Sequence, residues 1–236
     1  MTASRRNFIR TTGLTALGLG LLPSLSRSAT FSNTFYRPGP LLRMTPESQG
    51  VSSTTILNFV RAANASGLDW HSFMLLRHGH VIAEGWWKPF EPSFRHTLYS
   101  LSKSFTSTAI GLLVKEGRLS VEDAVISFFK DELPGNVSDN LGQMKVRHLL
   151  TMNTGHGEDT MPKLRDSKDT WTKAFLAQPV AYQPGSHFLY NTGATYMLGA
   201  IVYKVTGHTL EQYLAPRLFQ PLDIKGYDWE KSPQGL

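Results

Sequence analysis

The chain has 236 residues, of which 41% are hydrophobic and 18% are charged, a composition that supports a folded core and excludes a disordered chain. It contains no cysteine, which excludes disulfides, thiolate metal sites and a cysteine nucleophile. Residues 1–29 hold four arginines and no acid, so the formal net charge of +6 falls to +2 for the rest of the chain. We therefore expect no nucleic-acid partner.

The N-terminus has the layout of an export signal. Arg5 and Arg6 are followed by an uncharged apolar run over residues 13–22 and then by small residues. Paired arginines resemble a bacterial twin-arginine signal, and the apolar run is about half of the ~20 residues that span a bilayer. We expect residues 1–29 to be a signal peptide that meets the membrane only during export. The mature chain, residues 30–236, is then periplasmic or secreted.

The first half of the mature chain predicts a helix, a hairpin and a second helix. Apolar residues at helical spacing predict a helix over Ser53–Ala65. Two runs of strand-forming residues, 72–77 and 81–87, flank His78-Gly79-His80 and predict a β-hairpin. Residues 102–116 predict a helix that is buried nearly all round, because apolar side chains cover most of its circumference.

The second half is predicted to be mainly helical. The stretch from Ser120 to Asp123 resembles the start of a capped helix. Further helices are expected at Val146–Met152, Trp171–Ala177, Ala194–Thr206 and Leu210–Leu218. One hairpin among many helices predicts an α+β fold.

Ser100 and Lys103 form a Ser-x-x-Lys element at the start of the long apolar helix. Side chains three residues apart share a helix face, so the amine can reach the hydroxyl and serve as its base. The free N–H groups at a helix start also stabilise negative charge at the serine. The spacing occurs a second time at Ser127 and Lys130, a pair that we interpret as structural because no long buried helix follows it.

Histidines offer a weaker alternative chemistry. His78 and His80 alternate at the end of a predicted strand, as a two-histidine metal pair would. No third ligand lies in register with them, so we expect solvated turn histidines and no metal.

The stretch Tyr99–Ser107 resembles the active-site helix of the class C β-lactamase and penicillin-binding-protein-like serine hydrolases, a family that includes esterases, amidases and D-amino-acid peptidases. Residues 75–86, 146–156 and 184–193 resemble further segments of that family, in the same order. The resemblance implies a β-lactamase/transpeptidase-like fold, in which an antiparallel sheet is flanked by helices and joined by a helical subdomain.

The second motif of that family is Tyr-x-Asn. Carried over to this chain, its tyrosine is Tyr190, which the resemblance implies works with Lys103 as base and proton shuttle. The asparagine position holds Thr192, and Asn191 occupies the middle. We expect Thr192 and Asn191 to bind substrate, with one hydroxyl at Thr192 in place of an amide.

The third motif of the family, Lys-Thr-Gly or His-x-Gly on a later strand, is absent downstream of Tyr190. We therefore expect the chain to lack the C-terminal strands of the family and with them one oxyanion-hole donor. Loss of a single such donor costs roughly 10²–10³ in rate.

These features predict a serine hydrolase that cleaves ester or amide bonds of a small molecule or peptide through an acyl-enzyme on Ser100, without a cofactor. One alternative is a D,D-peptidase or β-lactamase that acts on cell-wall peptides or β-lactams. Another is a truncated product that is inactive or only binds penicillin. The Tyr-Asn-Thr sequence favours an esterase or amidase over a lactamase.

Overall fold

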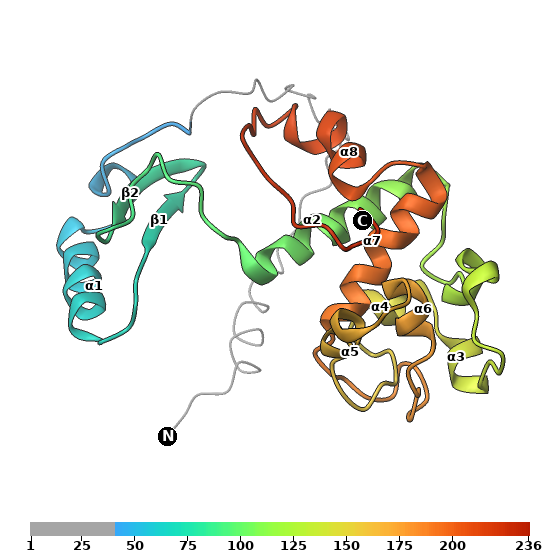
Figure 1. Ribbon diagram of the computed structural model, residues 1–236. Coiled ribbons are helices and arrows are strands. Elements are labelled where there is room, and N and C mark those ends of the chain that lie inside the picture. The colour runs from blue at the N-terminus through green and yellow to red at the C-terminus, as the bar shows by residue number, and fades with distance from the viewer. Residues whose placement is uncertain (1–40) are drawn as a thin grey trace, which may run out of the picture. The chain divides into compact units, whose positions relative to one another are not determined.

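The computed structural model describes residues 41–236 (Figure 1). The predicted signal peptide lies outside the described residues, so export stays a prediction. Within the described part, no helix is both long and apolar enough to cross a membrane. The longer elements are, in chain order, α1 (Ser53–Ala65), β1 (Ser72–Arg77), β2 (His80–Trp86), α2 (Ser102–Lys115), α3 (Asp139–Gln143), α4 (Val146–Leu150), α5 (Met161–Asp166), α6 (Trp171–Leu176), α7 (Thr192–Thr206) and α8 (Leu210–Leu214). Shorter helical turns are η1 (Glu47–Gln49), η2 (Tyr99–Leu101), η3 (Val125–Phe128), η4 (Lys130–Glu132) and the π-helical η5 (Ala215–Phe219).

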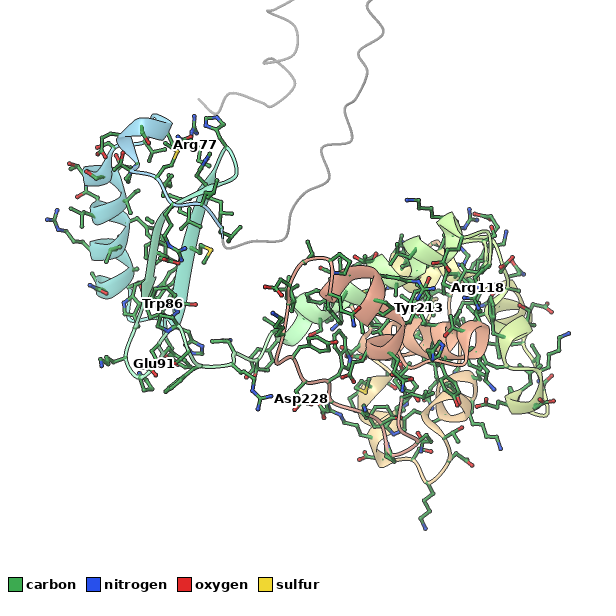
Figure 2. The ribbon with its side chains drawn as sticks, turned by 90° about the horizontal axis from the view of Figure 1, so that it is seen from above. Arg77, Trp86, Glu91, Arg118, Tyr213 and Asp228 are labelled. Carbon is green, nitrogen blue, oxygen red and sulfur yellow. The ribbon has the colours of Figure 1, made fainter. Side chains whose placement is uncertain are left out.

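The predicted hairpin is confirmed. Strands β1 and β2 are antiparallel, with Ser72 opposite Trp86 and Arg77 opposite His80. Figure 2 labels Arg77 and Trp86 at opposite ends of this sheet. His78 and Gly79 connect the strands and both have positive φ, as a type I′ hairpin turn requires. Helices together with this antiparallel sheet confirm the predicted α+β class.

Helix α1 packs on the hairpin through aromatic side chains. Phe59 meets the ring of Phe73 edge-on at a centroid distance of 5.4 Å and that of Trp70 at 5.7 Å. Asn64 anchors the far end of the helix, where its Oδ1 accepts a 2.6 Å hydrogen bond from Trp87 Nε1. Aromatic packing through Phe59 and the hydrogen bond to Asn64 therefore hold this helix on the hairpin.

The core of the helical part forms around α7. This helix contacts α2, α4, α6 and α8, and Figure 1 shows it running among them. Tyr213 of α8, labelled in Figure 2, is only 1% exposed. The other large side chains that are almost fully buried are Phe129, Phe175, Phe219, Ile110, Leu113, Met144, Leu149, Leu164, Leu176, Met197 and Ile201.

Helix α2 is less buried than predicted. Ala109, Ile110 and Leu113 are buried against the core, which the helix meets mainly through α7 and α8. Val114 is 40% exposed, and Leu101 at the N-cap is 57% exposed. The prediction of burial nearly all round is wrong, because these two partners cover only part of the circumference and the described sheet has two strands.

The segment from Ser120 to Asp123 is a turn and does not start an α-helix, contrary to the prediction. Its side-chain capping hydrogen bonds do form: Ser120 N donates to Asp123 Oδ2 at 2.8 Å, and Glu122 N donates to Ser120 Oγ at 3.1 Å. Ala124 then becomes extended and forms an antiparallel bridge with Lys145, which stops the backbone from continuing as a helix.

Candidate active site

The start of α2 places Ser100 beside Lys103. Ser100 lies in η2, directly before the helix, and Lys103 is the second residue of the helix. Lys103 Nζ donates a 3.1 Å hydrogen bond to Ser100 Oγ. The preceding residue, Tyr99, has a φ of +46°, a left-handed conformation that costs a non-glycine residue about 1–3 kcal/mol. The chain thus bends sharply where Ser100 is presented at the surface.

Tyr190 reaches the same hydroxyl from the segment that precedes α7. Its O–H donates a 2.6 Å hydrogen bond to Ser100 Oγ, although the two residues are 90 positions apart in sequence. Lys103 Nζ lies 5.1 Å from the centroid of the Tyr190 ring. Two of the three residues predicted to be catalytic, Lys103 and Tyr190, therefore meet at the Oγ atom of the third, Ser100. The catalytic role of all three stays a prediction.

The surroundings of the phenol favour its ionised form. The hydrogen bond with Ser100 is the largest cause that lowers the pKa of Tyr190, and Lys103 lowers it further. Slight burial and the negative charge of Asp159 act in the opposite direction and raise this pKa. The net shift is downward, so a larger fraction of this phenol is ionised at a given pH than of a free tyrosine.

The helix start supplies hydrogen-bond donors for negative charge. Among the described residues, none accepts a hydrogen bond from the Ser100 backbone N–H. The first turn of a helix also carries a partial positive charge. This N–H is therefore free to donate to a group placed beside Ser100 Oγ.

The family model described as Beta-lactamase matches residues 60–235. The chain belongs to the Beta-lactamase family. Protein flp of Staphylococcus aureus (strain MW2) is 27% identical over 139 residues, which cover 57% of this chain and 28% of that protein. A Salmonella agona (strain SL483) protein named for D-alanyl-D-alanine carboxypeptidase is 23% identical over 180 residues, which cover 65% of this chain and 42% of that protein. The chain spans less than half the length of these curated relatives.

Solved structures of Beta-lactamase-like proteins share the fold. The octameric penicillin-binding protein homologue of Pyrococcus abyssi aligns with a TM-score of 0.56 at 25% identity, over 73% of this chain and 43% of that one. A Bacteroides dorei protein named as a β-lactamase gives 0.57 at 18% identity, over 72% of this chain and 51% of that one. The β-lactamase/transpeptidase-like fold predicted from the sequence is confirmed, and the chain is a member of a family of hydrolases.

In this family member, Asn191 is a helix cap. Its side chain is fully buried, and its Oδ1 accepts hydrogen bonds from Ala194 N at 3.3 Å and from Thr160 Oγ1 at 2.8 Å. Its Oδ1 is therefore used inside the protein, and a role of Asn191 toward substrate stays a prediction. Thr192 is the first residue of α7 and is partly exposed, so its role toward substrate stays a prediction.

The second Ser-x-x-Lys element has a different geometry. Ser127 lies in η3 and donates a 2.7 Å hydrogen bond to the carbonyl of Ala124. Lys130 is exposed at the start of η4, and the described residues show no hydrogen bond between it and Ser127. The second pair thus lacks the amine–hydroxyl contact of the first.

The histidines occupy separate places. Within residues 41–236, no three or more histidine or acidic side chains are grouped so that they could hold a metal ion. His78 Nδ1 contacts Gln49 Oε1 at 3.0 Å, and His148 Nδ1 accepts from Lys145 N at the start of α4. His156 is 2% exposed and lines a cavity of about 310 Å³.

One residue beside the site was missed in the sequence. Asp159 Oδ1 accepts the backbone N–H of Thr192 at 2.9 Å and that of Met161 at 3.0 Å, so it links the start of α5 to the start of α7. A local signal was present, because Asp-Thr-Met-Pro is typical of a helix start. The contact with Thr192, 33 residues away, has no such signal.

Proposed function

We propose that this chain is a serine hydrolase that cleaves ester or amide bonds through an acyl-enzyme on Ser100. One observation carries the proposal: Ser100 Oγ lies 3.1 Å from Lys103 Nζ and 2.6 Å from Tyr190 OH. A serine hydroxyl becomes a useful nucleophile when a base lies within hydrogen-bond reach. Here two groups that can act as bases lie within that reach.

In the acylation step, Ser100 Oγ attacks the carbonyl carbon of the substrate. Its proton passes to Tyr190 when the phenol is ionised, with the nearby Lys103 ammonium stabilising the phenolate. The carbonyl oxygen becomes negative and is stabilised by the Ser100 backbone N–H. The bond to the leaving group then breaks, and Tyr190 returns the proton to the departing oxygen or nitrogen.

In the deacylation step, water takes the place of the leaving group. Tyr190 accepts a proton from the water as its oxygen attacks the acyl carbon. The bond between that carbon and Ser100 Oγ breaks, and Tyr190 gives the proton back to the serine. Acid is released, and the three side chains return to their starting protonation states.

A second candidate is a D,D-peptidase or a β-lactamase. It is favoured by the Salmonella agona relative named for D-alanyl-D-alanine carboxypeptidase, which matches 65% of this chain. The same three side chains would perform the same two steps on a peptide or on a β-lactam ring. The candidates therefore differ in the substrate and share the nucleophile.

Turnover of two chromogenic substrates by the full chain separates these candidates. We expect hydrolysis of a p-nitrophenyl ester and at most slow turnover of a chromogenic cephalosporin. Faster turnover of the cephalosporin than of the ester would favour the lactamase reading. Ser100→Ala is the control for both substrates, and equal turnover by wild type and Ser100→Ala would contradict the proposed nucleophile.

A further inference from the structure

Two loops beside Ser100 hold each other through reciprocal hydrogen bonds. Asp159 Oδ1, from the loop before α5, accepts the backbone N–H of Thr192 at 2.9 Å. Asn191, from the segment before α7, accepts the backbone N–H of Thr160 at 3.3 Å through its own Oδ1. Each loop thus supplies a side-chain oxygen to a backbone donor of the other. We call these two side chains, Asp159 and Asn191, the interlock.

The interlock is tightly packed. Asn191 also accepts a 2.8 Å hydrogen bond from Thr160 Oγ1, and the side chains of Asn191 and Thr160 are almost fully buried, while Asp159 is partly exposed. A Cβ atom added to Gly193 would collide with Thr160 Oγ1. The loop before α5 therefore leaves no room for the start of α7 to shift toward it.

The position of the Tyr190 side chain depends more on the interlock than on contacts that the ring itself makes. Its side chain is 48% exposed, so few neighbours restrain the ring. Its backbone directly precedes Asn191 and lies two residues before Thr192, the two positions that the interlock holds. The 2.6 Å contact with Ser100 Oγ is therefore set largely by where the interlock places this backbone.

We propose that Asp159 is a positioning residue that holds Tyr190 against Ser100 through the Thr192 backbone. This inference rests on the proposed function, because it assigns Asp159 to the site of that reaction. Asp159 does not contact Ser100 in the described hydrogen bonds and acts through Tyr190. Displacement of a catalytic group by about 1 Å can cost about a hundredfold in rate, so such a role has a measurable size.

The charge of Asp159 has a second effect that can be measured separately, on the pKa of Tyr190. Ser100 and Lys103 lower the pKa of Tyr190, whereas the carboxylate of Asp159 raises it. Asp159→Asn removes this charge and keeps an oxygen that can accept the same two backbone N–H groups. Asp159→Ala removes both the charge and the acceptor. The two variants therefore separate electrostatics from position.

The test measures kcat and KM for a nitrophenyl ester and titrates Tyr190 by its tyrosinate absorbance, identified by its loss in Tyr190→Phe. We expect Asp159→Ala to lower kcat about tenfold to a hundredfold with KM changed less than about threefold. We expect Asp159→Asn to lose less activity and to titrate Tyr190 at lower pH than wild type. Glu158→Gln, an exposed neighbouring carboxylate paired with Lys163, is the matched control and should change neither quantity.

Unchanged kcat in a folded Asp159→Ala would overturn the inference. If Asp159→Ala does not fold, the inference is tested with Asp159→Asn. A Tyr190 titration that is the same in Asp159→Asn as in wild type would then overturn the inference. Failure of the proposed function looks different: wild type and Ser100→Ala would turn over ester equally. In that case the Tyr190 titration still tests whether Asp159 acts on the phenol.

Discussion

We expect Lys103→Met to lower kcat/KM for a nitrophenyl ester by about 10²–10⁴ relative to wild type, because the proton transfers by Tyr190 contribute a factor in this range and depend on the charge that keeps the phenol ionised. The amine lies 3.1 Å from Ser100 Oγ, and methionine keeps a similar unbranched stem without a proton-accepting or charged end. The same change removes the positive charge that lowers the pKa of Tyr190. The loss should therefore appear mainly in kcat, with little change in the melting temperature, because Lys103 is only partly buried.

Lys130→Met is the matched control for this change. Lys130 belongs to the second Ser-x-x-Lys element and is exposed, so its replacement should leave ester hydrolysis unchanged. Steady-state kinetics of the two variants side by side tests the contrast. A Lys103→Met protein with more than half of the wild-type kcat/KM would contradict the role given to the amine.

Acid is expected to destabilise the protein through His156. This ring is 2% exposed, and burial lowers its pKa from 6.5 to about 4. It lies edge-on to Phe175 at 4.8 Å, and among the described residues its Nε2 has no hydrogen-bond partner, so a charge there would be poorly solvated.

The sign of the effect follows from the two pKa values. Well above pH 6.5 the His156 ring is neutral in both the folded and the unfolded protein, and the free energy of unfolding keeps its full value. As the pH falls from 6.5 toward 4, the unfolded chain binds a proton that the folded protein does not, and stability is lost. A shift of this size corresponds to roughly 3 kcal/mol of unfolding free energy over the window.

Urea unfolding at several pH values between 7 and 4 measures this slope. His156→Gln should flatten the slope, because glutamine does not titrate, even if its stability at neutral pH is lower. His187→Gln is the matched control, since His187 is exposed and should leave the slope as in wild type. Identical slopes for wild type and His156→Gln would contradict this account.

Local patterns predicted the helices well and their ends less well. Apolar spacing placed α1 at Ser53–Ala65, where the structure has it. Helix α7 was predicted from Ala194 but starts at Thr192, because Asn191 caps it through a side-chain hydrogen bond to Ala194 N. Hydrophobic periodicity detects the buried face of a helix, whereas its first residue is set by capping. The short helices α3 and α5 were missed because their segments, DNLGQ and MPKLRD, hold few apolar residues, whereas α4 and α6 of the same lengths were predicted from richer apolar patterns.

Contacts of the site between residues close in sequence could be predicted, and contacts between distant residues could not. Ser100 and Lys103 meet because of helical spacing, which the sequence displays directly. Tyr190 came from the family resemblance, since nothing local links it to a serine 90 residues away. Asn191 was assigned to substrate because its motif position says nothing of burial, and Asp159 was missed because its partner Thr192 is distant in sequence.

Covalent labelling tests the central claim most directly. The full chain is incubated with a fluorophosphonate probe, digested and mapped by mass spectrometry, in parallel with Ser100→Ala and Ser127→Ala. The proposed chemistry predicts one modified residue, Ser100, in wild type and in Ser127→Ala, and no modification in Ser100→Ala. Equal labelling of Ser100→Ala and wild type would contradict the assignment of Ser100 as the nucleophile.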